Sequence, residues 1–209
     1  MKLTLLALAA ATALVAAPAT APALSGVPSP FESTVDPCLV ACPAGDIVFH
    51  IVVRDLANNP VINSVVQIDF CGCPGVTLCP QSTTDPYVRV GPCQIRKVAD
   101  VNGRADFAIR AGGLCANQDV RVFADGVLIA FRRVASPDQD RNLMVDFADL
   151  LLAKAKKGGS DMTADFNCDA FVTDADMDFM VPHGGDDCPP PDPTPTIHGS
   201  WGSLKVIYR

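Results

Sequence analysis

The chain has 209 residues, with 23 acidic and 16 basic side chains and a formal net charge of −7. No cluster of Lys and Arg marks a basic surface, so the composition argues against a nucleic-acid partner. The sequence has no GxSxG, HExxH or P-loop motif, and a single Glu gives little support to a paired-carboxylate glycosidase site. We therefore predict a protein that is not an enzyme.

The N-terminus has the features of a secretory signal peptide. Lys2 precedes an apolar run over 3–17, and small residues and prolines follow, so we predict cleavage after Ala23. An uncleaved membrane anchor is the weaker alternative, because the run is shorter than the roughly 20 residues that a helix needs to cross a bilayer. No later segment is apolar enough to form a transmembrane span. We expect a secreted, extracellular protein, or one held at the cell surface by another molecule.

Nine cysteines fit an oxidising compartment, where disulfides are their usual state. They are Cys38, Cys42, Cys71, Cys73, Cys79, Cys93, Cys115, Cys168 and Cys188. A zinc site at the Cys-Gly-Cys pair or at the first two cysteines is the alternative, disfavoured because no histidine lies near them in the sequence. Cys168 and Cys188 are predicted to pair with each other. The odd total leaves one thiol free or joined to another chain.

After a Pro/Ser-rich spacer over 24–45, residues 46–135 are predicted to form a β-sandwich of immunoglobulin-like type. Asp125-Gly126 is a strong hairpin signal. The stretches Val53-Arg-Asp-x-x-x-x-Pro-Val and Val101-Asn-Gly-Arg-Ala-x-Phe resemble bacterial immunoglobulin-like and carboxypeptidase-regulatory-like domains. The expected strands lie at 46–54, 61–70, 86–90, 95–99, 104–110, 120–123 and 127–133.

Residues 136–188 hold 12 Asp against 4 basic side chains, and their acidic residues follow a repeated spacing. Loops 138–149 (DQDRNLMVDFAD) and 165–176 (DFNCDAFVTDAD) match the ligand spacing of a calcium loop, with side chains at positions 1, 3, 5, 9 and 12 and a backbone carbonyl at position 7. A solvated Asp-rich linker is the alternative. The predicted ligands are Asp138, Asp140, Asn142, Met144, Asp146 and Asp149, then Asp165, Asn167, Asp169, Phe171, Thr173 and Asp176.

Two further features favour structure over a linker. Val145 and Val172 occupy loop position 8, where calcium loops use an apolar residue to pair the two loops with each other. Each loop also precedes a helical pattern, over 149–157 and 176–181, and these end in Gly158-Gly159 and at Pro182. A loop followed by a helix is thus repeated at an interval of 27 residues.

This repeat resembles a type I dockerin, a resemblance that covers residues 136–188. It implies that calcium folds the module and that the module docks onto a cohesin domain of another protein. The residues implied to face that partner are Phe147, Ala148, Asp174 and Ala175. Leu143 and Ala170 depart from the pattern, since calcium loops favour glycine at position 6, where φ is positive. A non-glycine residue there costs on the order of 1 kcal/mol.

The sequence thus predicts a mainly β protein: an immunoglobulin-like β-sandwich, then a small α-helical dockerin-like calcium-binding module, then a Pro-rich linker and tail over 189–209. The predicted function is the docking of the β-sandwich onto a cohesin-type partner or surface scaffold. A calcium-rigidified surface or adhesion protein without a cohesin partner is the alternative. An accessory component of polysaccharide degradation, with a polysaccharide association, is the third.

Overall fold

A computed structural model describes residues 26–191 of the chain, so the expected signal peptide and most of the expected tail lie outside the described residues. The fold is mainly β, as predicted. The helices are α1 (Phe147–Ala155), α2 (Asp174–Met180) and the short 3₁₀ helix η1 (Val181–His183). The strands are β1 (Thr34–Val35), β2 (Leu39–Val40), β3 (Val48–Val52), β4 (Val65–Asp69), β5 (Val76–Leu78), β6 (Val88–Arg89), β7 (Gln94–Val98), β8 (Arg104–Ala108), β9 (Ala111–Gly113), β10 (Cys115–Ala124) and β11 (Val127–Ala135).

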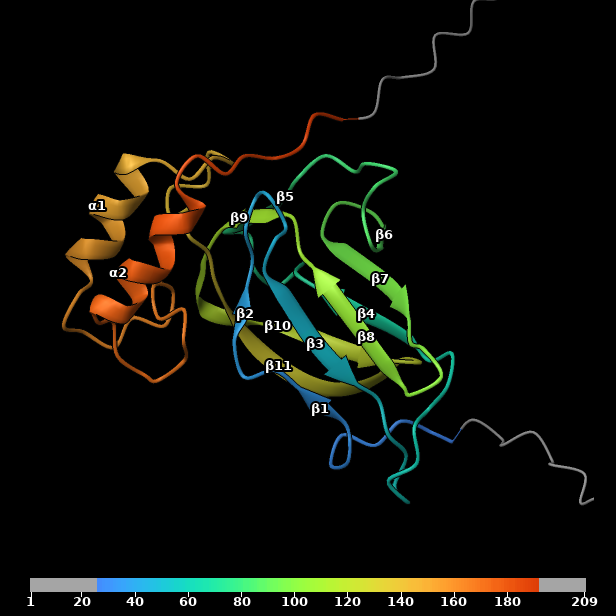
Figure 1. Cartoon of the computed structure of the whole chain (residues 1–209). Coiled ribbons are helices and arrows are strands. Elements are labelled where there is room, and N and C mark those ends of the chain that lie inside the picture. The colour runs from blue at the N-terminus through green and yellow to red at the C-terminus, as the bar shows by residue number, and fades with distance from the viewer. Residues whose placement is uncertain (1–25, 192–209) are drawn as a thin grey trace, which may run out of the picture.

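The strands form a six-stranded sheet in the order β2-β11-β10-β4-β7-β6, a three-stranded sheet β1-β3-β8 and a two-stranded sheet β5-β9. The three-stranded sheet lies across one face of the larger sheet, and both helices lie together at one end of the strands (Figure 1). The predicted hairpin joins β10 to β11. Asp125 and Gly126 both have positive φ, 47° and 81°, as a two-residue turn of this type requires.

The core between the sheets follows from alternation along the strands. Phe49 and Ile51 of β3 point inward, and Phe107 of β8 is fully buried with them. Val66 and Ile68 of β4 enter the same cluster from the larger sheet. Because side chains in a strand alternate between its two faces, this period-two pattern buries one face of each sheet against the other. The prediction of a β-rich fold is confirmed, and its immunoglobulin-like type stays a prediction.

The described part of the expected spacer is not a linker. Thr34 of β1 pairs with Val52, and β2 runs parallel to β11, with Leu39 opposite Val134. Both strands are two residues long and stand among prolines, so no alternating pattern marks them in the sequence. Prolines are tolerated beside such short pieces at the edge of a sheet.

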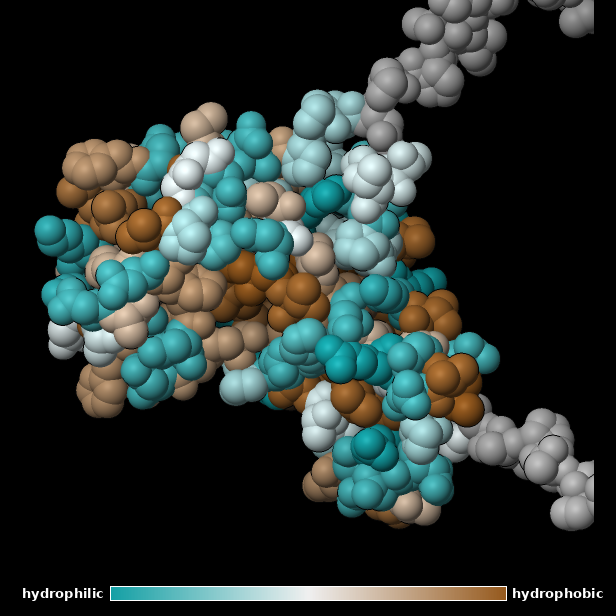
Figure 2. Space-filling view, in the orientation of Figure 1, coloured by the Kyte–Doolittle hydropathy of each residue, from teal (hydrophilic) through white to brown (hydrophobic). Residues whose placement is uncertain are grey.

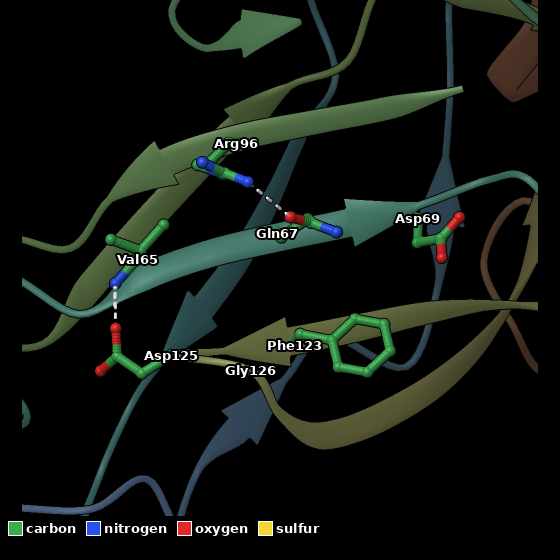
Figure 3. A pocket seen from close by; sticks show the side chains of 7 residues that line it. All are labelled: Val65, Gln67, Asp69, Arg96, Phe123, Asp125 and Gly126. Atoms are coloured by element: carbon green, nitrogen blue, oxygen red, sulfur yellow. Dashed lines mark hydrogen bonds between the residues drawn. The ribbon is translucent and has the colours of Figure 1, made fainter. Parts of the chain in front are cut away.

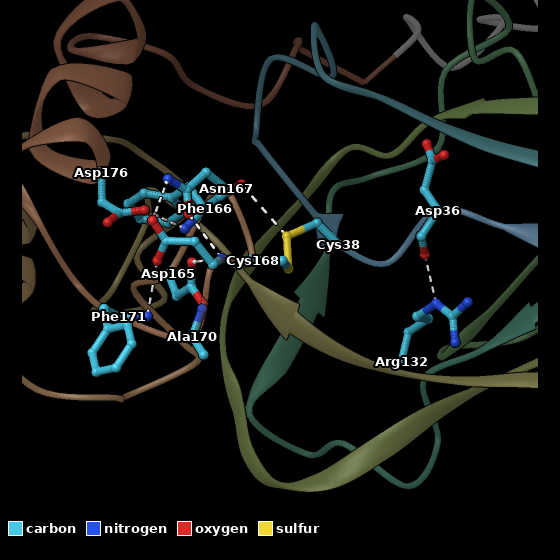
Figure 4. Close-up of a disulfide and its surroundings, with 11 residues drawn as sticks. Asp36, Cys38, Arg132, Asp165, Phe166, Asn167, Cys168, Ala170, Phe171 and Asp176 are labelled. Carbon is cyan, nitrogen blue, oxygen red and sulfur yellow. Dashed lines mark hydrogen bonds between the residues drawn. A yellow bond between two sulfur atoms is a disulfide. The ribbon is translucent and has the colours of Figure 1, made fainter.

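The predicted Cys168–Cys188 disulfide is wrong. Cys168 bonds Cys38, and Cys188 bonds Cys79, while two further disulfides join Cys71 to Cys93 and Cys73 to Cys115. Figure 4 shows the bond between Cys38 and the second acidic loop. Both cysteines of the helical part therefore reach across to the β part, over separations of 130 and 109 residues. Cys42 is the one free cysteine among these nine, and it is buried.

A second, smaller core joins the two parts of the molecule. Val40 of β2 and Ala135 of β11 pack with Ala153 of α1, Met180 of α2 and Phe166 of the second acidic loop. The helical part is therefore seated on the end of the sheet by apolar contact as well as by disulfides. Within residues 26–191, no helix is long and apolar enough to cross a membrane.

Candidate metal-binding loops

The two acidic loops close with the same hydrogen bonds. The carboxylate at position 1 accepts the amide of position 6: Leu143 N lies 2.9 Å from Asp138 Oδ2, and Ala170 N lies 2.9 Å from Asp165 Oδ2. At position 12, Oδ1 accepts the amide of position 2 at 2.7 Å in both loops. The 27-residue repeat of the sequence is thus a repeat of backbone structure.

Position 9 of each loop is the N-cap of the helix that follows. The side chain of Asp146 accepts the amide of Ala148, and the amide of Asp146 in turn donates to Asp149 Oδ2 at 2.8 Å. Thr173 and Asp176 form the same capping box at α2. Both predicted helices are therefore present, and each begins two residues before the predicted start, because the cap and not the last ligand sets the boundary.

Position 6 is left-handed in both loops. Leu143 has φ 67° and Ala170 has φ 74°, although neither is glycine. Position 4 is left-handed too, with φ 71° at Arg141 and 56° at Cys168. Calcium loops favour glycine at position 6 because of this sharp turn. The backbone at position 6 thus takes the left-handed turn that the ligand spacing implies, although Leu143 and Ala170 are less stable in this conformation than glycine would be.

The first and last carboxylates of each loop are buried. Asp138, Asp149 and Asp176 are 0% exposed and Asp165 is 1% exposed. Their hydrogen bonds come from backbone amides and, for Asp176, from the Thr173 hydroxyl; within residues 26–191 none of the four is paired with Lys or Arg. Buried carboxylates without a positive partner are costly.

The first loop gathers its carboxylates most closely. Oxygens of Asp138, Asp140 and Asp149 all lie within 4.8 Å of one another. Burial raises the pKa of Asp138 to about 6, and the neighbouring carboxylates of Asp149 and Asp140 add to the effect. Such a set of oxygens is suited to a hard divalent cation, which would neutralise the charge that makes the metal-free loop unfavourable.

A glycine of the β part lets the first loop approach the sheet. A Cβ on Gly112 in β9 would lie 1.8 Å from Asp138 Oδ2, so only glycine leaves room for this carboxylate. The amide of Gly113 also donates to the carbonyl of Asp138 at 2.9 Å. The position of the first ligand therefore depends on a strand far away in the sequence, and the acidic spacing alone contains no sign of this contact.

Loop position 8 pairs differently from the prediction. Val145 and Val172 do not bond each other. Val145 exchanges backbone hydrogen bonds at 2.8 Å with Gly185 and Asp186, which follow the second helix, and Val172 does the same, at 2.8 and 2.9 Å, with Gly158 and Gly159 after the first. Each loop is thus hydrogen-bonded to the segment that follows the helix of the other repeat. The two repeats therefore contact each other in an approximate two-fold arrangement. The interval from Gly158 to Gly185 is again 27 residues.

The residues implied to face a partner are all exposed, and their surroundings differ between the repeats. Phe147, 70% exposed, lines an apolar groove of about 420 Å³ together with Met144, Leu150, Met180, Val181 and others. Asp174 stands at the equivalent position of the second repeat, where it is paired with Lys157. Figure 2 shows hydrophobic side chains gathered over the helical part. The apolar groove thus belongs to one end of the repeat pair.

The outer face of the larger sheet carries a second, polar groove of about 630 Å³ (Figure 3). Gln67 of β4 lies between Phe123 of β10 and Arg96 of β7, and Arg96 donates to the Gln67 side chain at 3.0 Å. Asp69, Cys71 and Cys93 also cluster at the end of β4, but the two cysteines are joined as a disulfide and offer no thiolate to a metal. No pattern in the sequence marks this groove, because its residues come from three strands and a hairpin turn.

No protein-family model matches the chain, and no curated protein and no solved structure matches it either. The fold and the site define a disulfide-linked, β-rich protein with two acidic loop–helix repeats.

Proposed function

We propose that this is a secreted, non-catalytic protein whose two acidic loops bind calcium and whose helical repeats dock the β part onto a cohesin-type partner or an extracellular assembly. One observation carries the proposal: two loops of calcium spacing close with the same hydrogen bonds and bury their first and last carboxylates without a basic partner. Four disulfides agree with an oxidising compartment outside the cell.

Calcium suits the ligands of both loops. Every proposed ligand offers oxygen: carboxylates and amides at positions 1, 3, 5 and 12, a carbonyl from Met144 or Phe171 at position 7, and Asp146 or Thr173 at position 9. Hard oxygen donors in this number are the preference of Ca²⁺. Cys168 stands inside the second loop but is bonded to Cys38, so it adds no soft ligand there. Calcium would thus supply the positive charge that the buried carboxylates lack.

The docking surface would be centred on the apolar groove beside Phe147. Exposed apolar surface that a polar rim surrounds is typical of a protein–protein contact. Its counterpart in the second repeat is the Lys157–Asp174 ion pair, so the two ends of the repeat offer different chemistry. This difference between the two ends favours one docking orientation of the partner over two equivalent orientations.

The alternative of a calcium-rigidified surface or adhesion protein also has a specific observation in its favour. Two disulfides and the shared core around Val40 already fix the helical part against the sheet. In that case calcium would make the joined β and helical parts more rigid, without forming a surface for a partner. The third candidate, an accessory role in polysaccharide degradation, would place the polysaccharide in the polar groove around Phe123.

Calorimetric titration of the mature chain with calcium tests the proposal. The whole chain is needed, since residues 136–188 are bonded through Cys168 and Cys188 to the β part. We expect two sites, one lost in Asp138→Asn and the other in Asp165→Asn. Asp178→Asn, which removes an exposed carboxylate on α2 outside the loops, should keep both. Absence of calcium binding would reject the proposal, and binding by the mature chain that neither loop variant changes would do the same.

A further inference from the structure

Four potential metal ligands meet where the β part contacts the helical part. Cys42 follows β2 and Asp46 precedes β3, whereas His183 ends η1 and Asp186 lies three residues later. The four ligand atoms lie within 4.8 Å of one another. None of them belongs to the acidic loops, and the cysteine and the histidine are 141 residues apart in the chain.

The four ligand atoms lie at separations close to those within a metal-ligand shell. His183 Nδ1 lies 3.0 Å from Asp46 Oδ2, 3.0 Å from Asp186 Oδ2 and 3.8 Å from the Cys42 sulfur, and that sulfur lies 3.2 Å from Asp186 Oδ2. With usual zinc–ligand bond lengths, a tetrahedron sets its ligand atoms about 3.3–3.6 Å apart. Three of the observed separations are slightly shorter than that interval and the fourth is slightly longer, so small shifts of the side chains would form the tetrahedron.

A single proton on His183 Nδ1 cannot give both neighbouring carboxylates a hydrogen bond of full strength. Nδ1 can donate one hydrogen bond, yet two carboxylate oxygens stand 3.0 Å from it. Neither Asp46 nor Asp186 is paired with Lys or Arg in the described part of the chain. The cluster therefore gathers two carboxylates and a thiol around one imidazole, with no positive charge except what the imidazole can carry.

We propose that Cys42, Asp46, His183 and Asp186 bind one Zn²⁺ in a closed, four-coordinate structural site. The ligand types select the ion: a thiolate and an imidazole favour zinc over calcium or magnesium, which prefer oxygen throughout. Four protein ligands leave no open position, as in structural rather than catalytic zinc sites. Two carboxylates and a thiolate would leave the loaded site with a net charge of −1.

The site also gives a role to Cys42, the one cysteine that the four disulfides leave unpaired. Cys42 is fully buried, and burial together with its hydrogen bond to Asp186 raises the pKa of the thiol above its ordinary value. Without metal the thiol donates its proton to Asp186 Oδ2. Zinc binding would replace that proton, and the affinity should fall at lower pH, where protons compete for the ligands.

Zinc at this site would stabilise the contact between the helical part and the β part. Asp186 also accepts the amide of Val145 through its carbonyl, so it connects the cluster to the first acidic loop. The metal would hold the segment 183–186 against Cys42 and Asp46 of the β part, as a third cross-link beside Cys38–Cys168 and Cys79–Cys188. This inference does not depend on calcium binding by the loops.

Cobalt substitution tests the site, because Co²⁺ bound to a thiolate gives a charge-transfer absorption that oxygen-only sites lack. The metal-free mature chain, with its disulfides intact, is titrated with Co²⁺ and then with Zn²⁺. We expect one cobalt per chain with the thiolate band, displaced by one equivalent of Zn²⁺ and retained in excess Ca²⁺. Cys42→Ser should remove the band.

Asp46→Asn is the second variant, because this half-exposed side chain can be changed with little risk to folding. It should weaken zinc binding at least about tenfold, the smallest loss seen even for outer-shell partners. Asp187→Asn, which removes an exposed neighbouring carboxylate, should bind zinc as the parent does. The proposal is overturned if the parent chain shows no thiolate band, if Ca²⁺ displaces the cobalt, or if Asp46→Asn binds zinc unchanged.

Discussion

The β part and the helical part are stabilised by different means. The β part buries large side chains from facing sheets, among them Phe49, Phe107 and Ile68. The helical part has a much smaller apolar cluster, two short helices and four buried carboxylates. Helices of this length are marginal in isolation. Packing thus stabilises the sheets, whereas the repeats depend on the two disulfides that join them to the β part and on the ions that we propose they bind.

The largest effect is expected from the core of the β part. Phe107→Ala should lower the free energy of unfolding by about 3–5 kcal/mol, because it removes a fully buried ring between the sheets. Urea denaturation of the mature chain measures this loss. Phe131→Ala, which changes an exposed ring on β11, is the matched control and should change stability by less than about 0.5 kcal/mol. Equal losses in the two variants would contradict the assigned core.

Removal of the Cys38–Cys168 disulfide should lower the stability of the helical part more than that of the β part. With both cysteines changed to Ser, we expect a loss of about 2–5 kcal/mol that falls mainly on α1 and α2, because this bond ties them to the sheet. Amide hydrogen exchange locates the effect, with β4 and β10 keeping their protection. Removing Cys71–Cys93, a bond within the β part, is the control and should leave the helices protected. Equal loss of protection in both parts would contradict the comparison.

Calcium should stabilise the repeats and leave the sheets unchanged. At a concentration 100 times the dissociation constant, each site would add about 2.7 kcal/mol. Thermal unfolding followed by circular dichroism, with and without a chelator, should show the helical signal shifting and the β signal holding. A shift that persists in the Asp138→Asn, Asp165→Asn double variant would show that calcium acts elsewhere.

Gly112→Ala should disturb one loop and spare the other. The added methyl would meet Asp138 Oδ2, and such overpacking costs about 1–3 kcal/mol. We expect calorimetry to show one calcium site weakened and the second unchanged. Gly72→Ala, whose added Cβ would make only an ordinary contact of 3.6 Å with the carbonyl of Asp119 in the β part, serves as the control for calcium binding. Two unchanged sites in Gly112→Ala would show that the first loop does not depend on β9.

The smallest effect is expected at position 6 of the second loop. Ala170 is exposed and has φ 74°, so Ala170→Gly relieves a left-handed alanine and should strengthen calcium binding by up to about 1 kcal/mol, roughly fivefold. Calorimetry compares the two affinities. Ala175→Gly, on the exposed face of α2, should instead weaken the helix. Weaker calcium binding in Ala170→Gly would contradict the assignment of position 6.

Local patterns predicted much of this molecule. Each expected strand over 46–133 has a counterpart in the structure, the Asp125-Gly126 hairpin is confirmed, and the 27-residue spacing corresponds to a real structural repeat. These features are encoded by residues close together in the chain, through side-chain alternation, turn chemistry and helix capping. The predicted roles of the calcium ligands and of a partner remain predictions.

The features that no local pattern predicts depend on contacts between residues that are distant in the chain. The partners of Cys168 and Cys188 lie more than 100 residues away, and β2 pairs in parallel with the last strand of the β part. The approach of His183 to Cys42 is of the same kind: the sequence offered no neighbouring histidine, because folding brings it from the other part of the molecule. Spacing along the chain contains no information about such encounters.

Diffraction from crystals of the mature chain grown with calcium, with anomalous scattering to locate the ions, tests the central claim most directly. We expect two calcium ions, one bound by Asp138 and Asp149 and the other by Asp165 and Asp176. An ion in the second loop alone would show that Leu143 has disabled the first. Loops without an ion at saturating calcium would contradict the account, and the repeats would then be a capped helical scaffold without a metal role.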